Sequence, residues 1–284
     1  MSNPNLRLAI CVFGCISVPK YAIQMMKIQN TWGKRAEEKW GVPVYYFLGE
    51  EDVPGITNNP DGLIHGTTRF VYLPGVKNDY QSASYKQNLG IKYIMDHHPE
   101  IEYIYVCGTD TYVNIDRMLQ FLRFFDPIEP LYIGGHFNGT KLPLEMVDMR
   151  QEHQETRFFF GGAGFVLTRG MLDLLYPHLE PMTDLWILES MKHNRKDIIA
   201  ACDVMISYYV RKLGGKPVTY YHRFYECNHI GQLDLQHMFD HNRYYECCDR
   251  HIDQRNIITC HHMRDYPDEF KQFTDILEAN HWFM

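Results

Sequence analysis

The stretch Tyr103-Ile-Tyr-Val-Cys-Gly-Thr-Asp110-Thr-Tyr-Val-Asn114 carries the clearest fold signal in this sequence. Its apolar start, 103–106, is typical of a buried strand, and the chain leaves this strand through a polar turn that contains Asp110. A helix is expected over 115–125, closed by Asp126-Pro127. Ligands of open α/β sheets bind at the carboxyl ends of strands, where a carboxylate can hold a divalent cation that bridges a diphosphate. The alternative for Asp110 is an ordinary turn or helix-capping residue.

Strands and helices alternate on both sides of this stretch, which favours an α/β domain with a mostly parallel central sheet and helices on both faces. After residue 216 the pattern breaks into short aromatic, His- and Cys-rich pieces. We therefore expect a single domain over 1–284, with an α/β core over about 1–216 and an irregular cover over about 217–284 that completes the site. The expected strands are 6–13, 42–48, 70–73, 131–133 and 158–167, the last interrupted by the glycine segment 161–164, and the expected helices include 21–32, 82–97 and 202–213.

The chain is acidic, with a formal net charge of −7, and its 45% hydrophobic and 22% charged residues are those of an ordinary globular protein. This balance argues against disorder and against nucleic acid or an anionic membrane as the main partner. No apolar run reaches about 18 residues, so no transmembrane segment is expected. Leu8–Val18 is apolar enough to imitate a signal peptide but fits a first buried strand better. Without a signal or anchor, we expect either a cytosolic protein or a luminal domain cut from its anchor.

The 8 cysteines and 15 histidines allow more than one interpretation. An even cysteine count suggests disulfides if the protein is secreted, whereas Cys11, Cys15 and Cys107 lie in apolar runs and are expected to be buried. A zinc site in the C-terminal part is a weaker alternative to disulfides or buried thiols, because the spacing there matches no standard zinc finger. The candidate zinc ligands are His237, His241, Cys247, Cys248 and His251.

Four short motifs follow one another along the chain. They are Trp32-Gly33-Lys34-Arg35, Asp110-Thr111-Tyr112-Val113, Gly161-Gly162-Ala163-Gly164 and Tyr221-His222-Arg223-Phe224. In this order they resemble the TWGKR, DDDTYV, GGAG and FHPF motifs of glycosyltransferase family 31, the β-1,3-glycosyltransferases. Residues 125–134 and the pair Cys247-Cys248 resemble core 1 β-1,3-galactosyltransferases, and the GGAG segment is shared with fringe enzymes. The sequence is therefore similar to the core 1/fringe-like branch of the family over almost its whole length.

This resemblance implies a GT-A fold, a UDP-sugar donor, a manganese ion as cofactor and inversion at the anomeric carbon. The implied reaction is galactosyl or N-acetylglucosaminyl transfer to a glycan or glycoprotein acceptor, with 1–216 as the nucleotide-sugar-binding core. The family resides in the Golgi or ER lumen, and a homodimer is left open as a further partner. In an inverting displacement a base takes the proton of the acceptor hydroxyl, while a metal and cationic groups stabilise the charge on the leaving UDP.

The matching motif positions assign the metal ligands and the base. Asp110 takes the place of the metal-binding Asp, and His222 that of a second metal ligand. Asp203 takes the place of the catalytic base, and it opens a predicted helix whose dipole would keep the carboxylate ionised. Each assignment has a simpler alternative, in which Asp203 caps the helix and His222 is a hydrogen-bonded turn histidine of the cover.

Substrate contacts are implied in the same way. Arg35 has the alternative of pairing with Glu37 or Glu38 at the surface, and the glycine segment has that of a tight bend. The implied donor-binding residues are Arg35, Lys86, Thr109 and Asp110, and the implied acceptor-binding residues are Gly162, Ala163 and Gly164.

The sequence departs from the family at the acidic motif, where Gly108 and Thr109 replace the first two of three consecutive acids and leave one formal ligand at Asp110. Losing a group that supports a metal site typically costs ~10–100-fold in affinity or activity. That corresponds to about 1.4–2.8 kcal/mol, which weakens a site without abolishing it. The departure therefore keeps an alternative open, a non-catalytic GT-A protein that acts as a chaperone, a scaffold or a glycan-binding protein.

Overall fold

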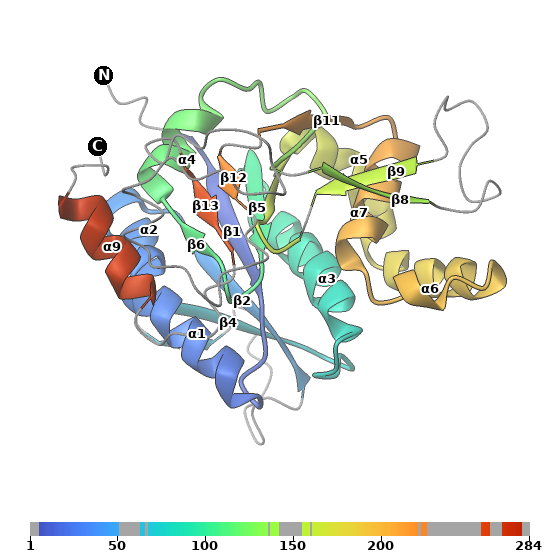
Figure 1. The fold of residues 1–284 in the computed structure, drawn as a ribbon, viewed down its shortest axis with the longest axis horizontal. Coiled ribbons are helices and arrows are strands. Elements are labelled where there is room, and N and C mark those ends of the chain that lie inside the picture. The colour runs from blue at the N-terminus through green and yellow to red at the C-terminus, as the bar shows by residue number, and fades with distance from the viewer. Residues whose placement is uncertain are drawn as a thin grey trace.

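The central sheet of the computed structural model contains eight strands, which are β1 (Leu8–Phe13), β2 (Val44–Gly49), β3 (Leu63–His65), β4 (Thr68–Leu73), β5 (Tyr103–Cys107), β7 (Leu131–Gly134), β10 (Phe165–Thr168) and β11 (Lys216–Thr219). Their order in the sheet is β11-β7-β10-β5-β1-β2-β4-β3 (Figure 1). Strands β1, β2, β4, β5, β7 and β11 run in one direction, while β10 and β3 run against their neighbours. The predicted mostly parallel sheet is confirmed.

The structure describes residues 6–50, 63–65, 68–135, 137–141, 155–159, 161–220, 223–225, 257–261 and 269–279. Within these ranges no helix is both long enough and apolar enough to cross a membrane. The sequence positions of Cys227, Cys247 and Cys248, and the zinc candidates His237, His241 and His251, lie outside the described residues, and the disulfide and zinc hypotheses for them stay predictions.

Helices cover both faces of the sheet, as the sequence predicts (Figure 1). Successive side chains of a strand point to opposite faces of the sheet. Each central strand therefore contributes side chains to two hydrophobic cores, one on each face. In β1, Leu8, Ile10 and Val12 belong to one core, and Ala9 and Cys11 to the other. The first core lies under α1 (Pro19–Asn30), α2 (Trp32–Trp40), α4 (Ile115–Leu122) and α9 (Glu269–Ala279), and the second under α3 (Ser82–His97), α5 (Arg169–Leu179), α6 (Met182–Lys192) and α7 (Cys202–Lys212).

A second, three-stranded sheet brings the C-terminal part of the chain to the centre of the molecule. It consists of β12 (Phe224–Tyr225), β13 (Thr259–Cys260) and β6 (Tyr112–Val113), in that order. Strand β13 runs antiparallel to β6, with Cys260 opposite Tyr112. Because β6 directly follows the turn that contains Asp110, this pairing carries the residues after β13 toward that turn. The part of the chain after 216, predicted as irregular, thus supplies strands to two sheets and the helix α9.

The strand predicted over 158–167 is interrupted at its glycine segment, as expected, and its two parts belong to different sheets. The first part belongs to β9 (Glu155–Phe159), which pairs with β8 (Phe137–Lys141), and the second part is β10 of the central sheet. The glycine segment Gly161–Gly164 lies between them, and Gly164 has a φ of 72°, a left-handed conformation that interrupts a strand. A Cβ atom at Gly164 would also overlap the hydroxyl of Tyr105, so this bend requires glycine.

Candidate active site

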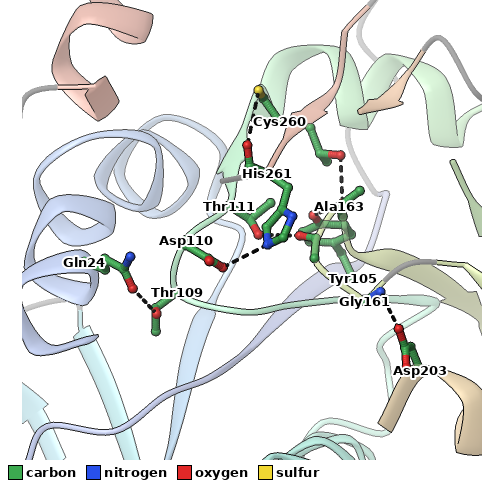
Figure 2. A network of polar contacts seen from close by, with 12 residues as sticks. Gln24, Tyr105, Thr109, Asp110, Thr111, Gly161, Ala163, Asp203, Cys260 and His261 are labelled. Carbon is green, nitrogen blue, oxygen red and sulfur yellow. Dashed lines mark hydrogen bonds and ion pairs between the residues drawn. The ribbon is translucent and has the colours of Figure 1, made fainter. Parts of the chain in front are cut away.

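The turn after β5 holds Asp110 beside a histidine that the sequence analysis did not identify. The Nε2 atom of His261 lies 3.3 Å from Oδ1 of Asp110, with side chains 7% and 18% exposed (Figure 2). His261 directly follows β13, whose pairing with β6 brings it to this place. The one signal that could have found it is the apolar run Ile257–Cys260, which reads as a short buried strand ending in histidine.

Asp110 and His261 fit a divalent cation. Two neighbouring ligands of an octahedral ion with bonds of ~2.1 Å lie ~3.0 Å apart, close to the separation seen here. Among the described residues no cluster of three or more His, Cys, Asp or Glu side chains occurs, so this pair would have to be completed by other ligands. The predicted ligand His222 lies outside the described residues. Without a metal, the same two groups form an imidazole–carboxylate pair.

Gly108, which replaces an acidic residue of the family motif, lies beside the Asp110–His261 pair. A Cβ atom built on Gly108 would lie 3.3 Å from Oδ1 of Asp110. An acidic side chain at this position would therefore extend next to the Asp110 carboxylate, and in this chain glycine leaves that side of the carboxylate open. The ligand lost with the family's acidic residue is one that would have stood beside Asp110.

The two threonines of the turn are anchored to neighbouring elements. The hydroxyl of Thr109 donates to Oε1 of Gln24 on α1 at 2.6 Å, and the hydroxyl of Thr111 donates to the carbonyl of Gly162 at 2.6 Å. The indole Nε1 of Trp32 donates to the carbonyl of Thr111 at 3.1 Å. Thr109 is thus adjacent to Asp110, as predicted, but its side chain points toward α1, and the Trp32 motif supports the turn.

The glycine segment borders both the Asp110–His261 pair and Asp203. A Cβ atom at Gly162 would overlap the imidazole ring of His261, so glycine at 162 permits the close approach of that ring. The carbonyl of Ala163 accepts from the hydroxyls of Tyr105, at 2.9 Å, and of Thr259, at 2.8 Å. The predicted acceptor segment Gly162–Gly164 therefore lies at the site, where Ala163 is buried and serves as an anchor.

Asp203 lies at the start of α7, on the other side of the same segment. Its Oδ2 accepts from the backbone N–H of Gly161 at 3.3 Å, and its Oδ1 from that of Val204 at 2.9 Å (Figure 2). Burial raises the pKa of Asp203, and these backbone hydrogen bonds oppose the rise without cancelling it. The helix start donates to the carboxylate, as expected, while burial has the larger effect on its pKa.

The two predicted donor-site cations have partners within the fold. The Nζ of Lys86, a buried side chain on α3, donates to the carbonyl of Gly14 at 2.7 Å and to Oδ1 of Asn78 at 2.6 Å. This places Lys86 at the carboxyl end of β1, at the same edge of the sheet as the Asp110 turn. Arg35 on α2 pairs instead with Asp116 at the start of α4, at 2.6 Å.

Asp116, at the start of α4, forms ion pairs with two cations of α2, Arg35 and Lys39. Its side chain is fully buried and also lies 2.7 Å from Nζ of Lys39. Burial raises the pKa of Asp116, but the hydrogen bonds and charges of Arg35 and Lys39 outweigh it, so the pKa is lowered overall. The Trp32–Arg35 motif therefore supports the Asp110 turn from two directions, through Trp32 and through Arg35.

Cys11, Cys15 and Cys107 are buried, as predicted from their apolar surroundings. Burial raises the pKa of the Cys11 and Cys107 thiols, and also that of the Cys202 thiol beside Asp203. Thiols of this kind stay protonated at neutral pH and are poor nucleophiles. Cys11, Cys15 and Cys107 therefore act as core residues.

The order and directions of the strands are those of a GT-A fold. The crystal structure of an active-site mutant of LgtC has the same fold, with a TM-score of 0.50 and 13% sequence identity over 95% of each chain. A sequence model described as Fringe-like matches residues 25–275, and the chain belongs to this family. The predicted membership of glycosyltransferase family 31 is thereby confirmed, and the enzyme class is that of the hexosyltransferases. The core 1 branch stays a prediction.

Two curated relatives share this domain. The chondroitin sulfate synthase 3 proteins of Mus musculus and Homo sapiens are each 26% identical to this chain over 234 residues. The match covers 79% of this chain and 24% of either relative, so the chain spans about a quarter of the length of the curated relatives it matches. These likenesses favour a glycosyltransferase over the non-catalytic alternative.

Proposed function

We propose that this chain transfers a hexose from a UDP-sugar to a hydroxyl of a glycan or glycoprotein acceptor, forming a β-1,3 linkage with inversion. The observation that carries the proposal is the glycine segment, which borders the Asp110–His261 pair on one side and Asp203 on the other. In the proposal the donor diphosphate lies at the Asp110–His261 pair, and the Asp203 carboxylate acts on the acceptor. Galactose and N-acetylglucosamine are both kept as donor sugars.

Asp203 is the proposed catalytic base. A base works best when its pKa lies near the working pH, and burial moves the pKa of Asp203 upward, in that direction. The backbone donors from Gly161 and Val204 hold the carboxylate in one orientation while it takes the proton of the acceptor hydroxyl. Attack by that oxygen at the anomeric carbon, with departure of UDP from the opposite face, gives inversion.

Asp110 and His261 are the proposed protein ligands of a divalent cation, with His222 as a further candidate. A bound Mn²⁺ ion would neutralise charge on the diphosphate of the leaving UDP. Lys86 keeps its proposed role at the donor side, where it fixes the end of β1 through the carbonyl of Gly14. Arg35 and Thr109 remain proposed as donor-side residues that support the Asp110 turn through Asp116 and Gln24.

The direct test is calorimetry of UDP binding with and without Mn²⁺. We expect Mn²⁺ to tighten UDP binding to the unaltered chain, and Asp110→Ala and His261→Ala each to remove most of that gain. The matched controls Asp173→Ala and His97→Ala change exposed residues of α5 and α3 and are expected to keep it. The assignment is refuted if Mn²⁺ tightens UDP binding to the Asp110→Ala and His261→Ala variants as much as to the controls.

Turnover is tested separately, by UDP release across a panel of UDP-sugars with glycan acceptors. We expect release to require both one donor sugar and an acceptor hydroxyl. Asp203→Asn is expected to abolish release while leaving UDP binding nearly unchanged, because Asp203 acts on the acceptor. UDP binding without release from any donor in the panel would support the non-catalytic alternative.

A further inference from the structure

Helix α3 presents a buried amide to the start of α7, where Asp203 lies. The side chain of Gln87 is 0% exposed, and its Nε2 donates to the carbonyl of Cys202 at 3.3 Å. The same nitrogen also donates to Oδ1 of Asn88 at 3.4 Å. Cys202 is the first residue of α7 and directly precedes Asp203. Gln87 is thus joined to the main chain that carries the proposed base.

The orientation of the Gln87 amide is determined by its surroundings. Both groups that its Nε2 contacts are acceptor oxygens, so a turned amide would place Oε1 against them. In the observed orientation Oε1 is buried and has no hydrogen-bond partner among the described residues. A buried acceptor without a partner lowers stability, and an apolar side chain of the same length would avoid that cost. Stability therefore does not explain an amide at this position.

The residue before Gln87 connects α3 to the donor side of the site. The Nζ of Lys86 donates to the carbonyl of Gly14, directly after the end of β1, at 2.7 Å. Two adjacent residues of one helix thus donate to main-chain carbonyls at the end of β1 and at the start of α7. Because groups placed on a helix are held more precisely than groups on a loop, this arrangement fixes the spacing of the two segments.

We propose that Gln87 is a positioning residue, which holds the start of α7 so that the Asp203 carboxylate meets the acceptor hydroxyl in the geometry of proton transfer. This inference rests on the proposed role of Asp203 as the base. Gln87 acts on the main chain at Cys202, whereas the N–H groups of Gly161 and Val204 orient the carboxylate itself. A displacement of ~1 Å at a reacting group can cost about 100-fold in rate, so a shift of the α7 start lowers turnover.

The first test measures steady-state turnover of Gln87→Met. Methionine has nearly the length of glutamine, has no donor and removes the unpaired Oε1. We expect kcat to fall ~10–100-fold, while the KM for the UDP-sugar and the affinity for UDP with Mn²⁺ stay unchanged. The free energy of unfolding in urea is expected to stay the same or to rise. Gln87→Glu keeps the shape of the side chain without its N–H groups and should also lower kcat.

Thr183→Val is the matched control. Thr183 is buried on α6, and its hydroxyl accepts from Nδ2 of Asn88 at 3.0 Å. The variant therefore removes a buried hydrogen bond between α3 and α6 and leaves the contact between Gln87 and α7 in place. We expect it to keep kcat. An unchanged kcat in Gln87→Met, or an equal loss in Gln87→Met and Thr183→Val, overturns the proposal.

The second test does not depend on turnover. Hydrogen exchange of the backbone N–H groups of Gly161 and Val204, measured by NMR, reports how firmly the Asp203 carboxylate is held. We expect Gln87→Met to raise both exchange rates above those of Thr183→Val, and equal rates in the two variants overturn the proposal. If the unaltered chain releases UDP from no donor, the proposed function fails, and these exchange rates still decide whether Gln87 positions Asp203.

Discussion

At the scale of single residues, the environment of Asp203 determines how the proposed base responds to pH. Burial raises its pKa and two backbone N–H groups oppose the rise. The sequence position at a helix start shows only the second effect, because burial depends on residues distant in the chain. This is why the sequence indicates the position of Asp203 at a helix start but not the rise in its pKa.

We predict that the acidic limb of the kcat/KM–pH profile lies above the ordinary pKa of an aspartate, about 3.9. Asp203 must be deprotonated to accept the hydroxyl proton, so its raised pKa moves this limb to higher pH. The raised pKa of Asp203 also makes the free energy of unfolding depend on pH. Between the unfolded pKa and the raised folded pKa, the native chain holds more protons, so its free energy of unfolding falls as pH increases.

The acidic limb is measured on the unaltered chain, and the effect on stability is measured against Asp203→Asn, which cannot titrate. Denaturant unfolding at a series of pH values should show the difference in free energy of unfolding between the unaltered chain and this variant decreasing as pH rises through that window. A parallel pH dependence of the two proteins would contradict the assigned direction of the pKa.

Gly162 gives the second prediction at this scale. Gly162→Ala places a methyl group in the position of the His261 ring and must displace it, so metal-dependent UDP affinity is expected to fall by ~10–100-fold. Gly108→Ala is the graded comparison, because its Cβ would lie 3.3 Å from Oδ1 of Asp110 and requires a shift of only a few tenths of an ångström, so a smaller loss is expected. Titration of UDP in the presence of Mn²⁺ compares the two variants. Equal losses would mean that the site does not depend on the position of His261.

At the scale of elements, the sequence predicts those that have a clear period or a long apolar run. The predicted strands 6–13 and 131–133 match β1 and β7, and the predicted helix 82–97 matches α3. The interruption of the predicted strand 158–167 at its glycines is visible in the sequence, but the placement of its two parts in different sheets depends on segments far away in the chain. Helices α5 and α6 were not predicted, and Pro177 within α5 conceals the first of them.

The residues of the site were also predicted only where the signal is local in the sequence. The turn with Asp110 was predicted because a buried strand leads into it. His261 was not, because β13 is only two residues long and a strand of this length has no period. Its position follows from pairing with β6, an interaction between segments distant in the sequence.

The contact between α2 and α4 gives a prediction for stability. Arg35→Met removes one cation from the fully buried Asp116 carboxylate while keeping much of the side-chain volume. Removing one partner of a buried pair costs about 3 kcal/mol, and the remaining Lys39 and the partial exposure of Arg35 place the expected loss at the lower side of this figure. Urea unfolding at neutral pH measures it.

The matched control is Lys34→Met on the same helix, whose ammonium lies 4.0 Å from Glu38 with both side chains exposed. Exposed pairs contribute little, so the expected change is below about 1 kcal/mol. Because the pKa of Asp116 is lowered, its ion-pair contribution is present above the unfolded aspartate pKa and is lost as pH falls through the folded value. A cost of Arg35→Met that does not shrink in acid would contradict this ion pair as its source.

At the scale of the whole molecule, the three-stranded sheet connects the start of α4 with the C-terminal part of the chain. A ligand held by Asp110 and His261 would bind β6 and β13 together, and binding to the native state alone stabilises it, by about 2.7 kcal/mol at a ligand concentration of 100 times Kd. We predict that UDP with Mn²⁺ raises hydrogen-exchange protection at β6 and β13.

Strand β4, near the far edge of the central sheet, serves as the internal reference, since it contacts neither residue of the pair. Its protection should follow only the global gain in stability. In His261→Ala the selective gain at β13 should disappear. A uniform gain over all strands in the unaltered chain would show that the ligand does not connect these two segments.

The pairing of β13 with β6 also determines when, during synthesis of the chain, the Asp110–His261 pair can form. The ribosome makes Asp110, Asp203 and most of the central sheet first, and these segments can begin to fold as they emerge. His261 is added only after them, and the proposed metal pair is incomplete until then. On the proposed assignment, a nascent chain with a folded sheet lacks one of the two metal ligands until β13 pairs with β6.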